Sequence, residues 1–275
     1  MKIRGFIITG VILLAAGAGI TGYAATREDF NKDMFTGGVT FSEISYNGED
    51  SGKVENVKFN ASADYINIVK SDTNEIKMNV KESAFYSYTY QINEETNTLE
   101  INQVKKEEWP FLIAFSFWNE EPFVLELPNT VALEVELNAG ALKINDLDLN
   151  DVKLHMNAGA TKLDNVVAKN VNLDIDAGAA SFENVTFDDL TVKLNAGALE
   201  FKNASVNSFV ADIDAGSFEY KGVVKTSATL EVSAGSGDIV LTDGADNYTV
   251  NGIGNGAAQI HYTCSAGSVK VSYAE

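Results

Sequence analysis

Short runs of alternating apolar and polar residues fill the C-terminal half of the chain. Apolar residues recur three positions before and four positions after a set of regularly placed glycines, as at Leu137 and Ile144 around Gly140. Runs with a period of two, broken by Asn, Asp and Gly, are typical of short strands joined by turns. A helical repeat would need a 3.6-residue period, which these runs lack.

The glycines stand 19 residues apart and sit in tetrapeptides of the form Asn/Asp/Ser-Ala-Gly-Ala/Ser. This turn ladder comprises Asn138, Gly140, Asn157, Gly159, Asp176, Gly178, Asn195, Gly197, Asp214, Gly216, Gly235, Gly254 and, in a shortened last copy, Gly267. A fixed period combined with strand patterning predicts coils of a parallel β-solenoid, stacked about 4.8 Å apart. We therefore expect an all-β fold with about eight 19-residue coils over residues 131–275.

The repeated small and polar residues have a structural explanation. Ala and Gly suit a corner that leaves no room for a bulky side chain, and the preceding Asn or Asp can hydrogen-bond the turn backbone. A second polar corner is expected six residues after each glycine, for example at Asp146 and Asn165. Cys264 stands three residues before Gly267, at a position that is apolar in earlier coils, so we expect it to face the core.

Residues 54–130 contain strand-like runs without the repeat and are predicted to form a β-rich N-terminal cap, preceded by a polar linker over residues 26–53. One segment of this cap is rich in aromatic residues, namely Trp109, Phe111, Phe115, Phe117 and Trp118. It is either a buried strand or loop, or an exposed patch that contacts a membrane interface or a partner protein.

The first 25 residues have the pattern of a membrane segment. Lys2 and Arg4 precede an uncharged stretch over residues 5–25, which has the length of ~20 residues that a spanning helix needs. Because the basic residues lie before the stretch, we expect a cytoplasmic N-terminus, one transmembrane helix in the cytoplasmic membrane and an extracytoplasmic C-terminal domain. A cleaved signal peptide is the alternative, since Gly22 and Ala24 suit a cleavage site.

Charge and composition exclude several classes of function. A formal net charge of −19 would repel phosphate backbones, so we expect no nucleic-acid partner. One Cys and two His leave no disulfide framework and few zinc ligands. The chain has no phosphate-binding loop, dinucleotide fingerprint or nucleophile elbow. We therefore expect no enzyme, no catalytic or metal-binding residues and no cofactor.

Two outward columns of charge remain as candidates. Four residues before the glycines, His155, Asp174 and Lys193 would form a balanced ladder. Three residues after the glycines, Glu200, Glu219 and Asp238 would form an acidic surface column. Stacked carboxylates can hold a hard cation such as Ca²⁺, but a solvated acidic face is the preferred interpretation.

The chain resembles the bacterial putative-adhesin family, a domain of unknown function. The resemblance covers residues 55–273 and rests on Leu127-Pro128 before the repeats, on the glycine turn ladder, and on the Gly235-Ser236-Gly237-Asp238 turn. The Ala-Gly-Ala turns of the earlier coils depart from the Ser-Gly-Asp or Ser-Gly-Ser turn of that family. The resemblance implies a membrane-anchored surface protein with a β-rich lead and a β-solenoid, and it brings no catalytic residues.

These observations favour a membrane-anchored binding protein, a putative adhesin or cell-surface interaction module. The expected partners are the cytoplasmic membrane, through residues 5–25, and an envelope protein, cationic peptide or surface polymer. One alternative is an envelope-stress regulator that binds another envelope protein or a cationic peptide through its acidic surface. A more distant alternative is a polysaccharide-acting β-helix enzyme, for which Asp174, Asp212, Glu200 and Glu219 would be the candidates.

Overall fold

The computed structural model describes residues 40–46, 53–73, 75–82, 86–106 and 122–274. The expected membrane segment (residues 1–25), part of the expected linker and the aromatic segment from Trp109 to Trp118 lie outside the described residues. No helix in the described part of the chain is long and apolar enough to cross a membrane.

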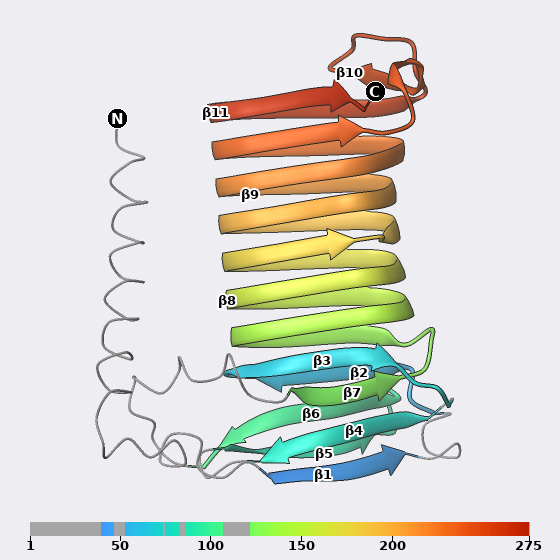
Figure 1. Ribbon diagram of the computed structural model, residues 1–275, viewed down its shortest axis with the longest axis vertical. Coiled ribbons are helices and arrows are strands. Elements are labelled where there is room, and N and C mark those ends of the chain that lie inside the picture. The colour runs from blue at the N-terminus through green and yellow to red at the C-terminus, as the bar shows by residue number, and fades with distance from the viewer. Residues whose placement is uncertain (1–39, 47–52, 74, 83–85, 107–121, 275) are drawn as a thin grey trace, which may run out of the picture.

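The described residues form an upright β-solenoid on a broader base (Figure 1). The base contains β1 (Thr40–Tyr46), β2 (Asn56–Ala61), β3 (Asp64–Lys70), β4 (Ile76–Glu82), β5 (Tyr86–Asn93), β6 (Thr98–Lys105) and β7 (Phe123–Leu127). Above it wind β8 (Ala132–Glu183) and β9 (Thr186–Leu241), followed by the short helix η2 (Ala245–Asn247), β10 (Tyr248–Val250) and β11 (Ala258–Tyr273).

The register between coils confirms the predicted solenoid. Strands β8 and β9 pair in parallel, with Ala177 opposite Ala196 and Phe182 opposite Phe201, each pair separated by one repeat. β11 pairs in parallel with the top coil of β9. Each coil therefore places the same repeat position above its predecessor, which is why the apolar residues form continuous columns.

Coil stacking continues into the region expected to be the cap. β2 and β3 pair in parallel with the first coil of β8, and β6 and β7 pair in parallel with β2 and β3. Antiparallel pairing begins only below, where β4 pairs with β7, β5 with β6, and β1 with β4. β1 lies within residues 26–53, the range expected to be a linker. The change of direction covers the lower end of the stack, where an unpaired edge would otherwise face solvent.

Inward columns of apolar side chains form one core along the rod. Phe182, Phe201 and Tyr220 occupy the same repeat position and are fully buried, and the rings of Phe182 and Phe201 stack with their centroids 4.6 Å apart. At the base, Phe59 packs edge-on against Phe123 with ring centroids 4.9 Å apart. Burial of a large apolar side chain contributes about 1.5–3 kcal/mol before the entropy of ordering the chain is subtracted.

The glycine ladder forms the first corner of the coils. At Gly159, Gly178, Gly197, Gly216, Gly235 and Gly267, an added Cβ would collide with the carbonyl of the glycine one coil below. The prediction for Gly254 is wrong, because this residue lies in an excursion between β10 and β11, next to Tyr248. Gly267 stacks on Gly235 instead. Gly254 keeps the 19-residue spacing in the sequence, but the segment that contains it does not form a coil of the stack.

The second corner is formed as predicted. Asp146, Asn165, Asn184 and Asn203 all have positive φ, between 51° and 56°. Their side chains also bridge the coils: Asn165 Nδ2 donates to Asp146 Oδ1 at 2.6 Å, and Asn203 Nδ2 donates to Asn184 Oδ1 at 2.7 Å. Asn and Asp tolerate the left-handed conformation and satisfy polar groups at the corner.

Cys264 is exposed, so the expectation of a core thiol is wrong. Its register partner one coil below, Val232, is only 2% exposed. β10 covers the first residues of β11, and among the described residues no strand lies above the rest of it. An inward position at the end of a stack therefore lacks the coil that would bury it.

Candidate functional site

The outer surface that follows the glycine corner combines a groove with a charge pattern, and we call it the groove face. Its floor and rim come from three outward columns, defined by their distance from the stacked glycines. The first column follows each glycine by one residue, the third column by three and the fifth column by five. Because the coils are in register, each column runs parallel to the rod axis.

The groove is apolar at its lower half. Its floor is made of the first-column residues Ala141, Ala160, Ala179 and Ala198, and the cavity volume is about 590 Å³. Small side chains in every coil leave this hollow, because larger ones would fill it. A second hollow of about 580 Å³ continues upward over Ser217 and Ser236. The two hollows share Ala198 and Glu200, so the groove extends over most of the solenoid.

A buried polar cluster closes the lower end of the groove. Asp64, which occupies the register position of Gly140, is fully buried and lines the groove floor. Its carboxylate accepts hydrogen bonds from the Tyr65 N–H at 2.7 Å and from the Tyr88 hydroxyl. Burial, and secondarily the negative charge of Asp64, raise the pKa of Tyr88 well above its ordinary value. Tyr88 therefore stays protonated and remains a donor.

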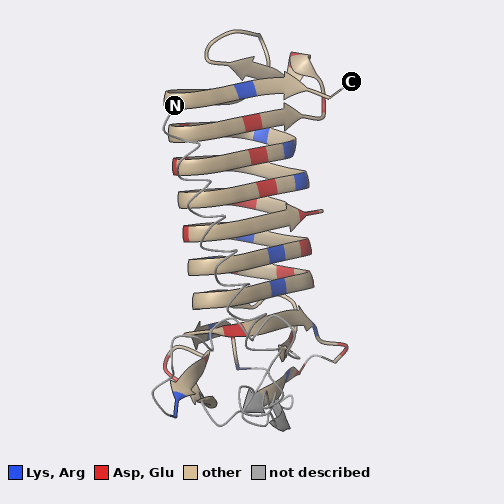
Figure 2. Ribbon diagram, turned by 60° about the vertical axis from the view of Figure 1, so that its left-hand side comes forward, with Lys and Arg blue, Asp and Glu red and all other residues tan. Residues whose placement is uncertain are grey.

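The third column changes sign along the rod. From base to top it contains Lys143, Lys162, Ser181, Glu200, Glu219, Asp238 and Lys270. Figure 2 shows this column as blue on the lower coils, red on the upper coils and blue again at the top. The expected acidic column is thus the upper part of a longer pattern whose lower part is basic.

The fifth column has the opposite arrangement of charges. It contains Asn145, Asp164, Glu183, Lys202, Lys221 and Val240 from base to top. Neighbouring columns form ion pairs: Lys162 Nζ lies 3.6 Å from Glu183 and 3.8 Å from Asp164, and Lys202 Nζ lies 2.8 Å from Glu200. The hydrogen bond with Glu200 raises the pKa of Lys202. The rim of the groove is therefore charged on every coil but neutralised in part within the chain.

The other candidate residues lie before the glycine corner or do not form a site. His155 Nδ1 lies 3.4 Å from Asp174, as the charge ladder predicts. Asp174 and Asp212 belong to that column, whereas Glu200 and Glu219 lie on the groove face, so the four carboxylates are divided between two columns. Within the described ranges, no group of three or more His, Cys, Asp or Glu residues could hold a metal ion.

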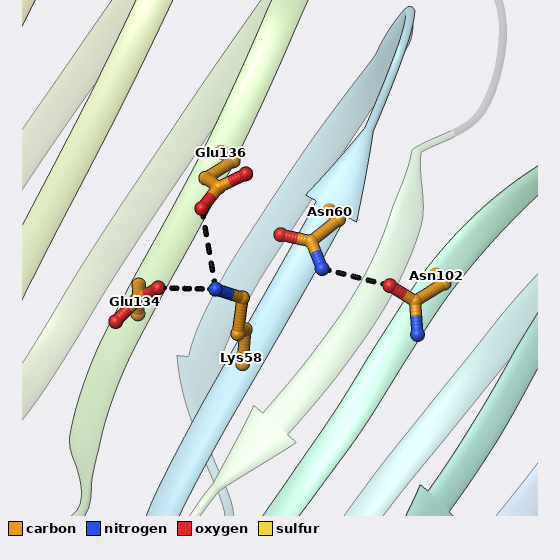
Figure 3. A network of polar contacts seen from close by, with 5 residues as sticks. All are labelled: Lys58, Asn60, Asn102, Glu134 and Glu136. Atoms are coloured by element: carbon orange, nitrogen blue, oxygen red, sulfur yellow. Dashed lines mark hydrogen bonds and ion pairs between the residues drawn. The ribbon is translucent and has the colours of Figure 1, made fainter.

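Polar contacts on this earlier surface join the base to the first coil. Lys58 donates to Glu134 at 2.6 Å and to Glu136 at 3.2 Å, and Asn60 donates to Asn102 at 2.7 Å (Figure 3). The hydrogen bond with Glu134 is the main cause of a raised Lys58 pKa. These side chains are partly exposed and link neighbouring strands, so we assign them to the structure of the base.

Sequence reasoning identified the acidic column but missed the groove. The sequence signal for the groove was the alanine or serine that follows each stacked glycine. We interpreted these small residues only as part of the turn. Only the stacked backbone shows that these small residues line one hollow, and that Lys143 and Lys162 continue the column of Glu200.

Comparisons with known proteins place the chain in a family. Solved structures to which this chain is similar include a putative adhesin from Bacteroides fragilis, 11% identical, with a TM-score of 0.44 over 86% of this chain and 97% of that one. Another is a putative lipid binding protein from Parabacteroides distasonis, 15% identical, with a TM-score of 0.34 over 87% of this chain and 98% of that one. A comparison with curated proteins found no match. Residues 54–273 match a family model, and the chain belongs to the family described as Toastrack DUF4097.

Proposed function

We propose that this protein is a membrane-anchored, extracytoplasmic solenoid that acts by binding, as an adhesin or cell-surface interaction module. The observation that carries the proposal is the groove face, which offers an apolar floor between charged rims over many coils. Repeat proteins typically bind along such extended surfaces. The uncharged stretch over residues 5–25, preceded by Lys2 and Arg4, supports the anchor.

A regulatory role is the second candidate. The third column is acidic on its upper coils, at Glu200, Glu219 and Asp238, and the whole chain has a net charge of −19. Such a surface would attract cationic peptides at the envelope, with an affinity that falls as salt screens the charges. The protein would then report the peptide to another envelope protein.

The native cysteine tests the location. We expect a membrane-impermeant maleimide to label Cys264 of the full chain in intact cells, because this thiol is exposed at the far end of the rod. The control is the full chain carrying Lys2→Cys and Cys264→Ser, which should be labelled only after the cells are opened. Labelling of the control, but not of the native chain, in intact cells would contradict the proposed orientation.

A groove-filling variant tests the binding role. Cells that display the full chain with Ala160→Trp and Ala179→Trp should no longer attach to the surfaces or peptides that cells with the unmodified chain bind. Asn172→Trp, on an exposed outward position before the corner, is the matched control and should bind normally. Equal binding by the groove-filled and unmodified chains would exclude the groove as the site. Loss only of cationic-peptide binding would favour the regulatory role.

A further inference from the structure

We propose that the groove face binds the same face of a second copy of this chain, with the two rods antiparallel. This inference rests on the proposed function of the groove face and names its partner. It is carried by the charge pattern of the third and fifth columns, which is complementary to itself when one rod is turned end over end.

The third column defines the register of the pair. A twofold axis perpendicular to the rods, placed between the coils of Ser181 and Glu200, brings these two residues of different copies together. The same axis places Lys162 opposite Glu219 of the second copy, and Lys143 opposite Asp238 of the second copy. Each contact occurs twice by symmetry. Every cation of the lower coils thus meets a carboxylate of the partner's upper coils.

The fifth column fits the same axis independently. Asp164 would face Lys221 of the second copy, and Glu183 would face Lys202 of the second copy. In this one register, each charged residue of both columns therefore faces either an opposite charge or a neutral residue of the second copy. Charged pairs of this kind contribute mainly to orientation and partner choice, because wrong arrangements bring like charges together.

Three other arrangements are disfavoured by the same residues. A twofold axis that is parallel to the rods and runs along the third column would place Lys162 against Lys162 and Glu219 against Glu219. Moving the antiparallel register by one coil toward the top would bring Glu200 against its own copy, and moving it toward the base would do the same for Glu183. Opposed like charges cost free energy in all three arrangements.

The floor of the groove allows the two faces to approach. In this register Ala179 meets Ala198 of the second copy, and Ala160 meets Ser217, so small side chains lie along the centre. The six coils from Gly140 to Gly235 span about 24 Å, and five strand residues span about 17 Å, giving roughly 400 Å² per copy. An interface of this size is weak and transient on its own.

Antiparallel pairing has a geometrical consequence for anchored rods. The first described strand, β1, lies at the lower end of the base (Figure 1). In an antiparallel pair the bases of the two copies would lie at opposite ends. Copies anchored in two facing membranes satisfy this arrangement. Many weak pairs acting together would then hold the two surfaces.

The test uses the full chain reconstituted into neutral phosphatidylcholine vesicles at physiological salt. We expect vesicles carrying the unmodified chain to cluster, as measured by light scattering. The variant Lys143→Glu/Lys162→Glu should not cluster with itself, and neither should Glu219→Lys/Asp238→Lys, because each opposes like charges. A mixture of the two variants should cluster again, because every reversed charge then meets a reversed partner.

Matched controls make the same kinds of charge reversal at residues that lie before the glycine corner, outside the groove face. Lys153→Glu/Lys193→Glu and Asp174→Lys/Asp212→Lys should cluster like the unmodified chain, and circular dichroism should show that all variants fold. Labels on Cys264 of paired copies should lie about seven coil spacings, roughly 34 Å, apart. A short distance between the labels would overturn the antiparallel arrangement.

Two further results would overturn the inference. One is the absence of clustering by the unmodified chain, and the other is a mixture of the two variants that clusters no more than either alone. If the groove-filled variant still loses attachment to another surface in the cell assay, the proposed function survives and only the partner is wrong. If groove filling also has no effect, both proposals fail.

Discussion

The place that a Cβ atom would take at Gly197 is occupied by the backbone carbonyl oxygen of Gly178 one coil below. Gly197 also has a φ of +138°, in a region that other residues rarely adopt. Two separate constraints therefore require glycine here. The collision involves backbone atoms that belong to the coil stack, so they cannot move aside without separating the coils.

Gly197→Ala should destabilise the protein severely. The unfavourable φ alone costs about 1–3 kcal/mol, and the collision with the stacked backbone should bring the total above about 4 kcal/mol. Urea unfolding measures the change. Gly244→Ala is the control, because Gly244 has a φ of +93° but nothing within 4 Å of its Cβ position. It should show only the cost of the φ angle, and equal losses for the two variants would contradict the steric argument.

Asn184 should prefer glycine to alanine as a replacement. Its φ is 54°, and its side chain donates to Asp164 at 3.2 Å and accepts from Asn203 at 2.7 Å. Both variants lose these hydrogen bonds, but only Asn184→Ala keeps an unfavourable φ, so it should be about 1 kcal/mol less stable than Asn184→Gly. Thermal unfolding gives the comparison. At Asn172, in an extended strand, the order of the two replacements should be reversed.

The fold could be predicted from the sequence because each coil repeats one local solution. The spacing of Gly140, Gly159 and Gly178 specifies the coil length, and alternation specifies which side chains enter the core. Asp146 and Asn165 mark the second corner because their chemistry suits positive φ. In these coils the local conformational preferences of the residues and the stacking of the coils favour the same structure, so the sequence pattern alone predicts the fold.

Other features depend on how coils are stacked and could not be predicted. Gly254 keeps the 19-residue spacing, but periodicity cannot distinguish a coil from an excursion of similar length. Cys264 has the pattern of a core residue, and its exposure depends on the missing coil above it. The groove arises from the shape of the corner, and the complementarity of Lys162 and Glu219 appears only when two rods are compared.

Alkaline pH should destabilise the protein through its buried tyrosines. Burial is the first cause of raised pKa values at Tyr88, Tyr220 and Tyr248, assisted at Tyr88 by Asp64. Below pH 10 the folded and unfolded states both keep these protons, so the full stability is present. Above pH 10 the unfolded chain releases protons that the folded chain retains, and stability falls. Each tyrosine should contribute a slope of about 1.4 kcal/mol per pH unit.

Tyr88→Phe should separate the effect of tyrosine ionisation on stability from the effect of ring packing. At pH 8 the variant should be less stable by about 1.5–3 kcal/mol, because the buried Asp64 carboxylate loses a donor. Above pH 10 its stability should fall less steeply than that of the unmodified protein, so the two curves converge. Urea midpoints between pH 8 and 11 provide the measurement. Phe59→Leu, whose ring lies 5.9 Å from that of Tyr88, removes packing without an ionisable group, so its curve should run parallel to the unmodified one.

The thiol of Cys264 should react with a soluble disulfide reagent in the native state at the rate of a small free thiol. The side chain is exposed because no described strand covers this part of β11, although its register partner Val232 is buried. The chain with Val232→Cys and Cys264→Ser moves the thiol down by one coil. Its reaction should be at least about 1,000-fold slower, because the thiol becomes accessible only when the stack opens. Similar rates at the two positions would show that the top coils open readily, and slow reaction of native Cys264 would show that this end of the rod is covered.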